Sequence, residues 1–152
     1  MRTPAEILRD ARTIAVVGTG EGWRIGLSVC YDVRFPELYR ILALEGAELV
    51  TVPAHFTTPT GKDHWHVLLR ARAIENQLYV AAAAQVGETI RGKPAYGRSL
   101  IADPWGVVVA QAPDEETVIS AELDRARLQA IREQLPSLKN RQAAAYRWPT
   151  PA

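Results

Sequence analysis

Short apolar runs alternate with amphipathic segments along most of this chain. Runs rich in valine, isoleucine and leucine predict buried strands, and apolar residues three or four positions apart predict helices with one buried face. The predicted strands cover residues 13–17, 23–30, 48–53, 78–85, 99–102, 107–110 and 117–123, and the predicted helices cover residues 3–12, 36–46, 63–77 and 124–134. Strands that alternate with helices indicate β-α-β crossover units, so we expect an α/β fold with helices layered on a sheet.

Proline and glycine mark the ends of several of these elements. Pro36 stands at the start of the helix predicted over residues 36–46 and Gly46 at its end, which are the usual positions of these residues. Residues 103–106, Asp-Pro-Trp-Gly, have the order that a type I turn prefers, and they predict a hairpin. Residues 87–97 hold glycines and a basic tip, and we expect a loop there.

The composition is typical of a soluble globular domain. The chain has 152 residues, the length of one ordinary domain, of which 47% are hydrophobic and 23% charged. Its 18 basic and 17 acidic residues give a formal charge of +1, so no electrostatic reason favours nucleic acid or an anionic membrane as a partner. We expect neither a membrane span nor a secretory signal. A single cysteine cannot form an internal disulfide and fits a reducing, cytoplasmic setting.

That cysteine, Cys30, is the first candidate for chemistry. It ends the strand predicted over residues 23–30, and a helix begins shortly after it, at Pro36. Free backbone N–H groups at a helix start favour a thiolate and can hold an oxyanion. A lone cysteine is most often a small buried hydrophobe, so a structural role stays open beside that of a nucleophile.

The residues around Cys30 resemble those of a known family. Residues 26–38, Gly-Leu-Ser-Val-Cys-Tyr-Asp-Val-Arg-Phe-Pro-Glu-Leu, are similar to the nucleophile segment of the nitrilase superfamily of carbon–nitrogen hydrolases. The similarity continues, in order, through residues 59–61, Trp65, 69–76, 97–99 and 103–106, and it covers residues 23–148. The branch that it resembles most is the deaminated-glutathione amidase and ω-amidase group. The resemblance implies an α-β-β-α sandwich, which we expect to be incomplete here because the N-terminal half of the family is missing.

The resemblance also implies a reaction. In this family a cysteine thiolate attacks an amide or nitrile carbon, ammonia leaves, and water hydrolyses the acyl-thioester. Cys30 stands at the nucleophile position, and neither a cofactor nor a metal is implied. A small carboxylate-bearing amide is the implied substrate of the closest branch.

The family's glutamate base and its stabilising lysine are not assigned. The resemblance implies that both come from the N-terminal half of the fold. In this chain the first lysine is Lys62, which follows the nucleophile. Glu6 and Glu21 are the only glutamates before Cys30, and their surroundings are unlike the family's glutamate motif.

Three segments are expected along the chain. Residues 1–22 form an atypical N-terminal helix, strand and turn, residues 23–135 form the C-terminal portion of the hydrolase core, and residues 136–152 form an irregular docking tail with Tyr146 and Trp148. Without the N-terminal strands, sheet edges and apolar faces would be uncovered. We therefore expect a homo-oligomer or a partner chain.

Two alternatives to an active amidase stay open. One is a catalytically inactive remnant or interaction module of the same fold. The other is a CoA- or nucleotide-binding module, because residues 6–18 are similar to the opening of small CoA-binding Rossmann proteins. The glycines that follow do not complete the phosphate-binding motif, which argues against this second alternative.

A few further side chains are candidates for the site. The substrate-binding candidates are Arg34, His55 and Thr57. Residues 57–60 and 91–93 are candidate pocket rims. Asp32 is expected to order the loop after Cys30, and Arg70, Arg72 and Glu75 are expected to form an ion-pair network at a helix end. His64 and His66 are two residues apart on a predicted helix and point in different directions, so we expect no metal site.

Overall fold

The computed structural model describes residues 14–90 and 92–146. The helix predicted over residues 3–12, Glu6, Arg91 and Trp148 lie outside the described residues. The strands are β1 (Val16–Gly18), β2 (Arg24–Leu27), β3 (Leu49–Thr51), β4 (Tyr79–Ala82), β5 (Val86–Ile90), β6 (Lys93–Tyr96), β7 (Leu100–Ala102) and β8 (Val108–Gln111). The helices are α2 (Pro36–Leu44), α3 (Thr58–Thr60), α4 (His66–Asn76) and α5 (Arg125–Gln134), with 3₁₀ turns η1 (Cys30–Arg34) and η3 (Ala143–Ala145) and a π-helical turn η2 (Gly61–Trp65).

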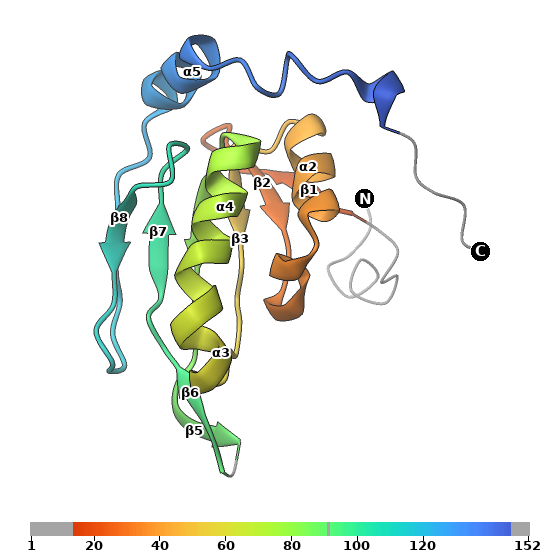
Figure 1. Cartoon of the computed structure of the whole chain (residues 1–152). Helices are drawn as coiled ribbons and strands as arrows, with labels where there is room; N and C mark the ends of the chain where they lie inside the picture. Colours follow the sequence, from red (N-terminus) through yellow and green to blue (C-terminus); the bar gives the residue numbers. More distant parts are fainter. Residues whose placement is uncertain (1–13, 91, 147–152) are drawn as a thin grey trace, which may run out of the picture.

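One mixed sheet forms the centre of the molecule. Its strand order is β1-β2-β3-β4-β7-β8, in which β2, β3 and β4 are parallel and the other neighbours pair antiparallel. Helices α2 and α4 lie on one face of this sheet, and α5 lies at the end opposite to the β5–β6 hairpin (Figure 1). Because parallel strands end on the same side, the segments that follow β2, β3 and β4 meet at one edge of the sheet. Cys30 is in one of those segments.

The main core fills the space between the sheet and the two helices. Its fully buried side chains include Tyr39, Leu42, Val50, Trp65, Leu69, Val80 and Leu100. Trp65 packs against Phe56, with 4.9 Å between ring centroids, and its indole N–H donates to the Arg98 carbonyl at 2.8 Å. Burial of each large side chain contributes roughly 1.5–3 kcal/mol. This core therefore fixes α4 and the segment after β3 in one arrangement.

The opposite face of the sheet is only partly covered. Leu49 and Tyr79 are paired across β3 and β4, and both pack with Leu128 of α5 in a second, smaller cluster. Further along this face, Val17 and Leu27 are 38% and 41% exposed. The described residues thus build one helical layer and one sheet layer of the α-β-β-α sandwich that the sequence leads us to expect, and the α/β class is confirmed.

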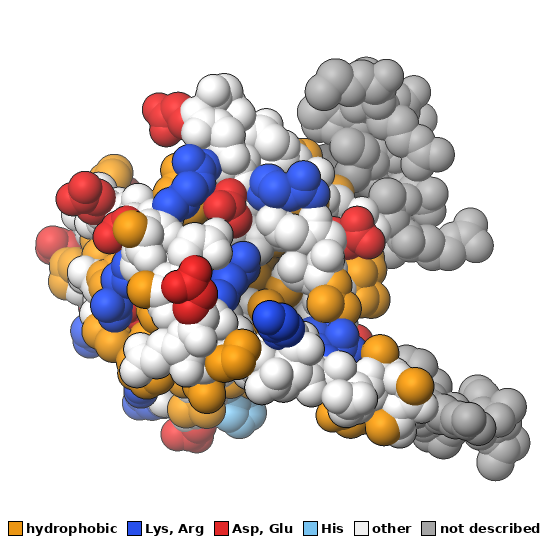
Figure 2. All heavy atoms as spheres, turned by 90° about the horizontal axis from the view of Figure 1, so that it is seen from above, with side chains coloured by type: hydrophobic (Ala, Val, Ile, Leu, Met, Phe, Trp, Pro, Cys, Tyr) orange, Lys and Arg blue, Asp and Glu red, His pale blue; other side chains and the backbone are white. Residues whose placement is uncertain are grey.

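Arginines attach α5 to the sheet. Arg125 pairs with Glu48 at 3.2 Å, Arg127 pairs with Asp103, and Arg132 donates to the Gln77 carbonyl at 3.0 Å. Basic and acidic side chains are interspersed on the face that carries this helix (Figure 2), in keeping with the nearly balanced charge of the chain. Among the described residues, no helix combines the length and the apolar character that a bilayer crossing needs.

Several predicted elements are confirmed. Helix α2 has Pro36 in its first turn, and Asp124 caps α5 by accepting the Ala126 N–H at 2.7 Å. The turn between β7 and β8 forms as expected, because the Asp103 carboxylate accepts the N–H groups of Trp105 and Val107.

Three predicted elements differ from the structure. Residues 87–97 are not a loop, since β5 and β6 pair as a hairpin in which Gly87, Gly92 and Gly97 take positive φ. Helical structure starts at Thr58, five residues before the predicted start at residue 63. The strand predicted over residues 117–123 is wrong, because this segment forms no strand, and Val118 is 92% exposed.

The tail contacts the body of the protein at another residue than expected. Leu138 packs against the main core, whereas Tyr146 is 68% exposed. The docking role expected for Tyr146 stays a prediction.

Gly61 gives a direct test of the packing around η2. A Cβ atom at this position would lie 2.2 Å from Cγ of Tyr96, although the backbone of Gly61, with φ −64° and ψ −44°, suits alanine. We expect Gly61→Ala to lower the free energy of unfolding by roughly 1–3 kcal/mol, measured by urea denaturation. Gly20→Ala is the control, because nothing lies within 4 Å of its Cβ, and equal midpoints for the two variants would contradict this packing.

Candidate active site

Cys30 continues the hydrogen-bond ladder between β2 and β3 beyond the ends of both strands. The Ser28 N–H donates to the Thr51 carbonyl at 3.2 Å, and the Cys30 N–H donates to the Pro53 carbonyl at 2.8 Å. The next acceptor along the second segment, the His55 carbonyl, receives the Cys30 S–H group at 3.6 Å. The Cys30 thiol therefore donates where a further backbone N–H of the first segment would donate if the β2–β3 ladder continued.

The backbone at Cys30 is left-handed. Its φ is +47°, a conformation that non-glycine residues adopt at a cost of about 1–3 kcal/mol. Asp32 orders the turn that follows, as expected, because its carboxylate accepts the Val29 N–H at 2.9 Å while its own N–H donates to the Val29 carbonyl at 3.0 Å.

The position of the thiol differs from the prediction in one respect. Strand β2 ends at Leu27, three residues before Cys30, and Cys30 is the first residue of η1, which lies between β2 and α2. The backbone donors closest to Cys30 in sequence therefore belong to η1 rather than to α2. The Tyr31 N–H follows the thiol directly, in the first turn of η1, where backbone donors have no intrahelical acceptor.

A buried tyrosine supports the segment before the thiol. The Tyr39 hydroxyl of α2 lies 2.7 Å from Ser28 Oγ, which in turn donates to the Thr51 carbonyl at 2.9 Å. Tyr39 is fully buried, and its desolvation raises the pKa of the phenol to about 12. The side chain is therefore a neutral hydrogen-bonding group over the whole physiological range.

Two of the three substrate-binding candidates lie beside the thiol segment. Arg34 closes η1, and its guanidinium lies over the rings of Tyr31 and Phe56, 5.4 and 5.2 Å from their centroids. The backbone carbonyl of His55 accepts the hydrogen bond from the Cys30 thiol. The ring Nε2 of His55 is buried without a hydrogen-bond partner among the described residues. Thr57 lies further along, where it bridges to Ala95 of β6.

The two described candidates for a base and a cation lie elsewhere. Glu21 precedes β2, at the opposite end of this strand from Cys30, and its carbonyl accepts from Arg125 at 3.4 Å. Lys62 lines a cavity of about 460 Å³ together with Tyr96 and Asp114. Among the described residues, the recorded hydrogen-bond partner of the thiol is thus a backbone carbonyl.

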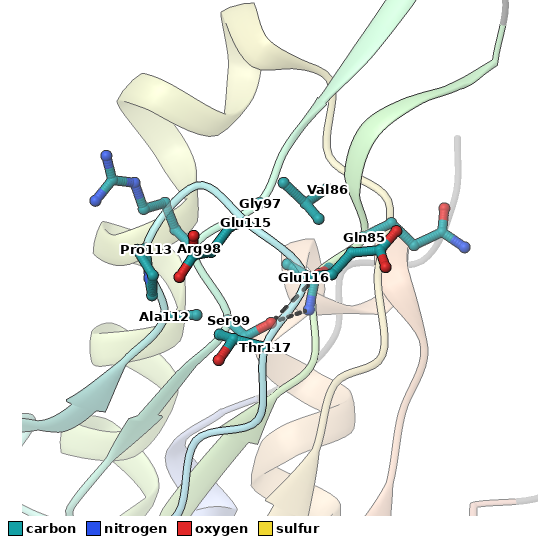
Figure 3. Close-up of a pocket in the computed structure, with 11 residues that line it drawn as sticks. Gln85, Val86, Gly97, Arg98, Ser99, Ala112, Pro113, Glu115, Glu116 and Thr117 are labelled. Atoms are coloured by element: carbon teal, nitrogen blue, oxygen red, sulfur yellow. Dashed lines mark hydrogen bonds between the residues drawn. The ribbon is translucent and has the colours of Figure 1, made fainter.

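A neighbouring cavity of about 350 Å³ lies between the ends of β4 and β7 and the segment after β8 (Figure 3). Gln85, Arg98, Glu115 and Glu116 are among the residues that line it, and Ser99 bonds both the N–H and the carbonyl of Ala84. Arg98 also lines the first cavity and pairs with Asp114 at 2.6 Å. Both cavities lie on the β4–β7 side of the edge, whereas Cys30 follows β2.

His64 and His66 have separate partners. His64 Nδ1 lies 3.4 Å from the Arg34 guanidinium, and His66 Nε2 lies 2.9 Å from the Gln111 amide oxygen. Within residues 14–90 and 92–146, no group of three or more His, Cys, Asp or Glu side chains is arranged to hold a metal ion.

The ion pair expected at the end of α4 is confirmed, and it does more than predicted. Arg72 and Glu75 lie 2.6 Å apart, while Arg70 donates instead to the Gly106 carbonyl at 2.7 Å. Arg72 also donates to the Val33 carbonyl in η1. The spacing could have shown that Arg72 is buried, because Arg72 is three residues after buried Leu69 and so falls in the apolar stripe of α4.

Comparison with known proteins gives a consistent result. The sequence matches the family described as carbon-nitrogen hydrolase over residues 3–133, a range that starts inside the segment expected to be atypical. It is 53% identical over 117 residues to a deaminated glutathione amidase of Synechocystis sp.. The aligned region covers 77% of this chain and 43% of that protein. The chain thus spans less than half the length of this curated relative.

Solved structures agree with the sequence match. The C. elegans NitFhit protein superimposes with a TM-score of 0.80 and 46% identity, over 88% of this chain and 32% of that one. A mutant of the amidase from Nesterenkonia sp. AN1, with a TM-score of 0.72 and 32% identity, covers 87% of this chain and 46% of its own. That structure shows covalent addition of the acetamide moiety of fluoroacetamide at the active-site cysteine.

Tyr39 gives the site a predictable response to alkaline pH. A phenol ionises near pH 10 in the unfolded chain and at about 12 in the folded one, so the folded state holds its proton longer. The stabilising contribution is complete below pH 10 and is lost as pH rises from 10 to 12, by at most roughly 1.4 kcal/mol per pH unit. Urea denaturation at several alkaline pH values measures this loss.

Tyr39→Phe is the control for this prediction. It removes the hydrogen bond to Ser28, at a cost of about 1 kcal/mol near pH 8, and it removes the ionisable group. The alkaline slope should therefore be shallower in the variant. Burial also raises the pKa of Tyr79, which remains as a background in both proteins. Identical slopes would show that Tyr39 does not carry the effect.

Proposed function

The chain belongs to the carbon–nitrogen hydrolase family, and from this membership we propose that it hydrolyses the carbon–nitrogen bond of a small carboxylate-bearing amide, with the Cys30 thiolate as nucleophile. The observation that carries the proposal is the placement of Cys30. It stands in a left-handed turn at the sheet edge, partly exposed, where a side chain can reach a bound substrate. The covalent adduct at the active-site cysteine of the Nesterenkonia amidase supports the same role.

The reaction proceeds by acyl transfer to sulfur. The thiolate attacks the amide carbon, and the carbonyl electrons move to the oxygen to give a tetrahedral oxyanion. When that oxyanion collapses, the carbon–nitrogen bond breaks and the nitrogen takes a proton and leaves as ammonia. Water then hydrolyses the thioester and restores the thiol. The Tyr31 N–H, directly after the nucleophile, is the proposed backbone donor to the oxyanion.

The base and the cation of the reaction are proposed to come from outside the described residues. The S–H group faces the His55 carbonyl, which accepts a hydrogen bond but does not act as a base at neutral pH. Glu21 and Lys62, the described candidates, lie at other places in the fold. Glu6 lies outside the described residues.

The proposed substrate follows from the relatives and from the charge near Cys30. The Synechocystis relative is named a deaminated glutathione amidase, so deaminated glutathione is the first compound to test. The Arg34 guanidinium is the proposed partner of a substrate carboxylate, with His55 and Thr57 as further proposed contacts. No cofactor is part of the proposal. A cytoplasmic setting stays a prediction from the single cysteine.

An inactive interaction module is the competing function. It is favoured by the same observation that leaves the base unassigned, namely the backbone carbonyl as partner of the thiol among the described residues. The two functions differ in whether ammonia is released.

Ammonia release and labelling of Cys30 test the proposal together. We expect the wild-type chain to release ammonia from deaminated glutathione or α-ketoglutaramate, and Cys30→Ala to lower the rate by roughly 10³-fold or more, since it removes the nucleophile. Fluoroacetamide should add one acetamide group to the wild type by mass spectrometry. Cys30→Ala, which has no thiol, is the control for both measurements.

Each failure has its own meaning. Labelling of Cys30 without ammonia release would favour the inactive module. A thiol that is neither labelled nor required for ammonia release would contradict the role of Cys30 as nucleophile.

We also propose that the chain associates with a second copy. Val17 and Leu27 form an exposed apolar patch on the partly covered face of the sheet. Exposed apolar patches mark interaction surfaces. Light scattering at micromolar concentration should give a mass above the 16.8 kDa of one chain. Leu27→Lys, which places a charge on the exposed face, should lower that mass. A sharp monomer with cooperative thermal unfolding would contradict association.

A further inference from the structure

Arg72 is a buried cation beneath the turn that carries Cys30. It belongs to α4 and is only 5% exposed. Its Nε donates to the Val33 carbonyl at 2.9 Å, and its Nη1 lies 2.6 Å from Glu75 Oε1. Val33 is fully buried and belongs to η1, so α4 is bonded directly to the turn on the far side of the thiol.

Tyr39 supports the other side of the same turn. Its hydroxyl meets Ser28 Oγ at 2.7 Å, two residues before Cys30. The guanidinium of Arg72 lies over the Tyr39 ring, 5.5 Å from its centroid. Arg72 and Tyr39 therefore form one contiguous pair that reaches both flanks of the nucleophile.

The depth of Arg72 needs an explanation that its ion pair does not supply. Glu75 is 34% exposed, so an ion pair with it could form at the surface, where a guanidinium keeps its water. Burial of the cation adds a desolvation cost. This cost is offset by the hydrogen bond to the Val33 carbonyl and by the contact with the Tyr39 ring. The turn is also where support is needed, because a left-handed cysteine persists only when its surroundings determine the conformation.

We propose that Arg72 is a positioning residue for Cys30: with Tyr39 it holds both flanks of the turn, so that the backbone of Cys30 stays left-handed and its sulfur stays at the edge beside His55. The inference rests on the proposed function, in which Cys30 is the nucleophile. Arg72 acts through Val33 and Tyr39 and not on the sulfur itself.

A stability cycle tests the conformational part of this inference without any activity. A left-handed position favours glycine over alanine, whereas a position with negative φ does not. In the otherwise unchanged chain, Cys30→Gly should therefore melt about 2–4 °C above Cys30→Ala. In an Arg72→Met background the turn is free to relax, and this difference should disappear.

Glu75→Gln is the matched control for the cycle. It removes the ion pair of Arg72 and keeps the bond from Nε to Val33, so the advantage of glycine should persist. The inference is overturned if the advantage survives undiminished in Arg72→Met, or if Glu75→Gln abolishes it equally. Where Arg72→Met does not fold, Arg72→Lys decides, because lysine keeps the charge near Glu75 and has no Nε donor of this geometry. A full advantage of glycine in that background overturns the inference too.

Steady-state kinetics test the catalytic part. Arg72→Met should lower kcat for ammonia release by roughly 10- to 100-fold, the cost of a misplaced reacting group, and should leave KM within about twofold. Glu75→Gln should leave both constants within about twofold of the wild type. Unchanged kcat in Arg72→Met overturns the catalytic role. A wild type that neither releases ammonia nor labels at Cys30 refutes the proposed function instead, and the stability cycle still decides the inference about the turn.

Discussion

The parallel pairing of β2 with β3 is the constraint on which the rest of this edge depends. Its register continues past both strands. The Ser28 N–H, the Cys30 N–H and the Cys30 S–H donate in turn to the carbonyls of every second residue of the segment after β3, at positions 51, 53 and 55. Gly26 allows this arrangement, because any Cβ there would lie 3.1 Å from Val50 and 3.2 Å from Leu42. The absence of a side chain at this one position lets Leu42 of α2 pack closely against β2.

Local sequence signals predicted the elements that local interactions determine. Pro36 and Asp124 start helices where expected, and the Asp103 turn forms with its own carboxylate as acceptor. The blocks of residues around the lone cysteine were sufficient to find the family, whereas the role of Cys30 as nucleophile stays a prediction. These features depend on neighbours within a few residues, which a single sequence displays directly.

Features that depend on distant partners were missed. The segment over residues 117–123 has strand-forming residues, but a strand also needs ladder hydrogen bonds to a neighbour, and this segment pairs with no strand of the described chain. The β5–β6 hairpin looked like a loop because its glycines were taken as breaks rather than as positions of positive φ within a bulged ladder. At the site, the acceptors that place Cys30 and Arg72 are backbone carbonyls, and no residue type in the sequence reveals which carbonyl will be reached.

The S–H group that extends the ladder would give the proposed covalent state of Cys30 a structural signature. In the proposed reaction, acylation would replace the hydrogen of the thiol, so the His55 carbonyl would lose the donor that lies 3.6 Å away in the free protein. The same segment continues to the Thr57 bridge with Ala95 of β6, so this change would occur in the segment that joins the Cys30 edge to the β5–β6 hairpin. If the proposed thioester forms, the hydrogen bond from the thiol to the His55 carbonyl is absent for as long as the thioester lasts. The covalent bond to substrate would then form at the expense of one hydrogen bond between the Cys30 side chain and the protein backbone.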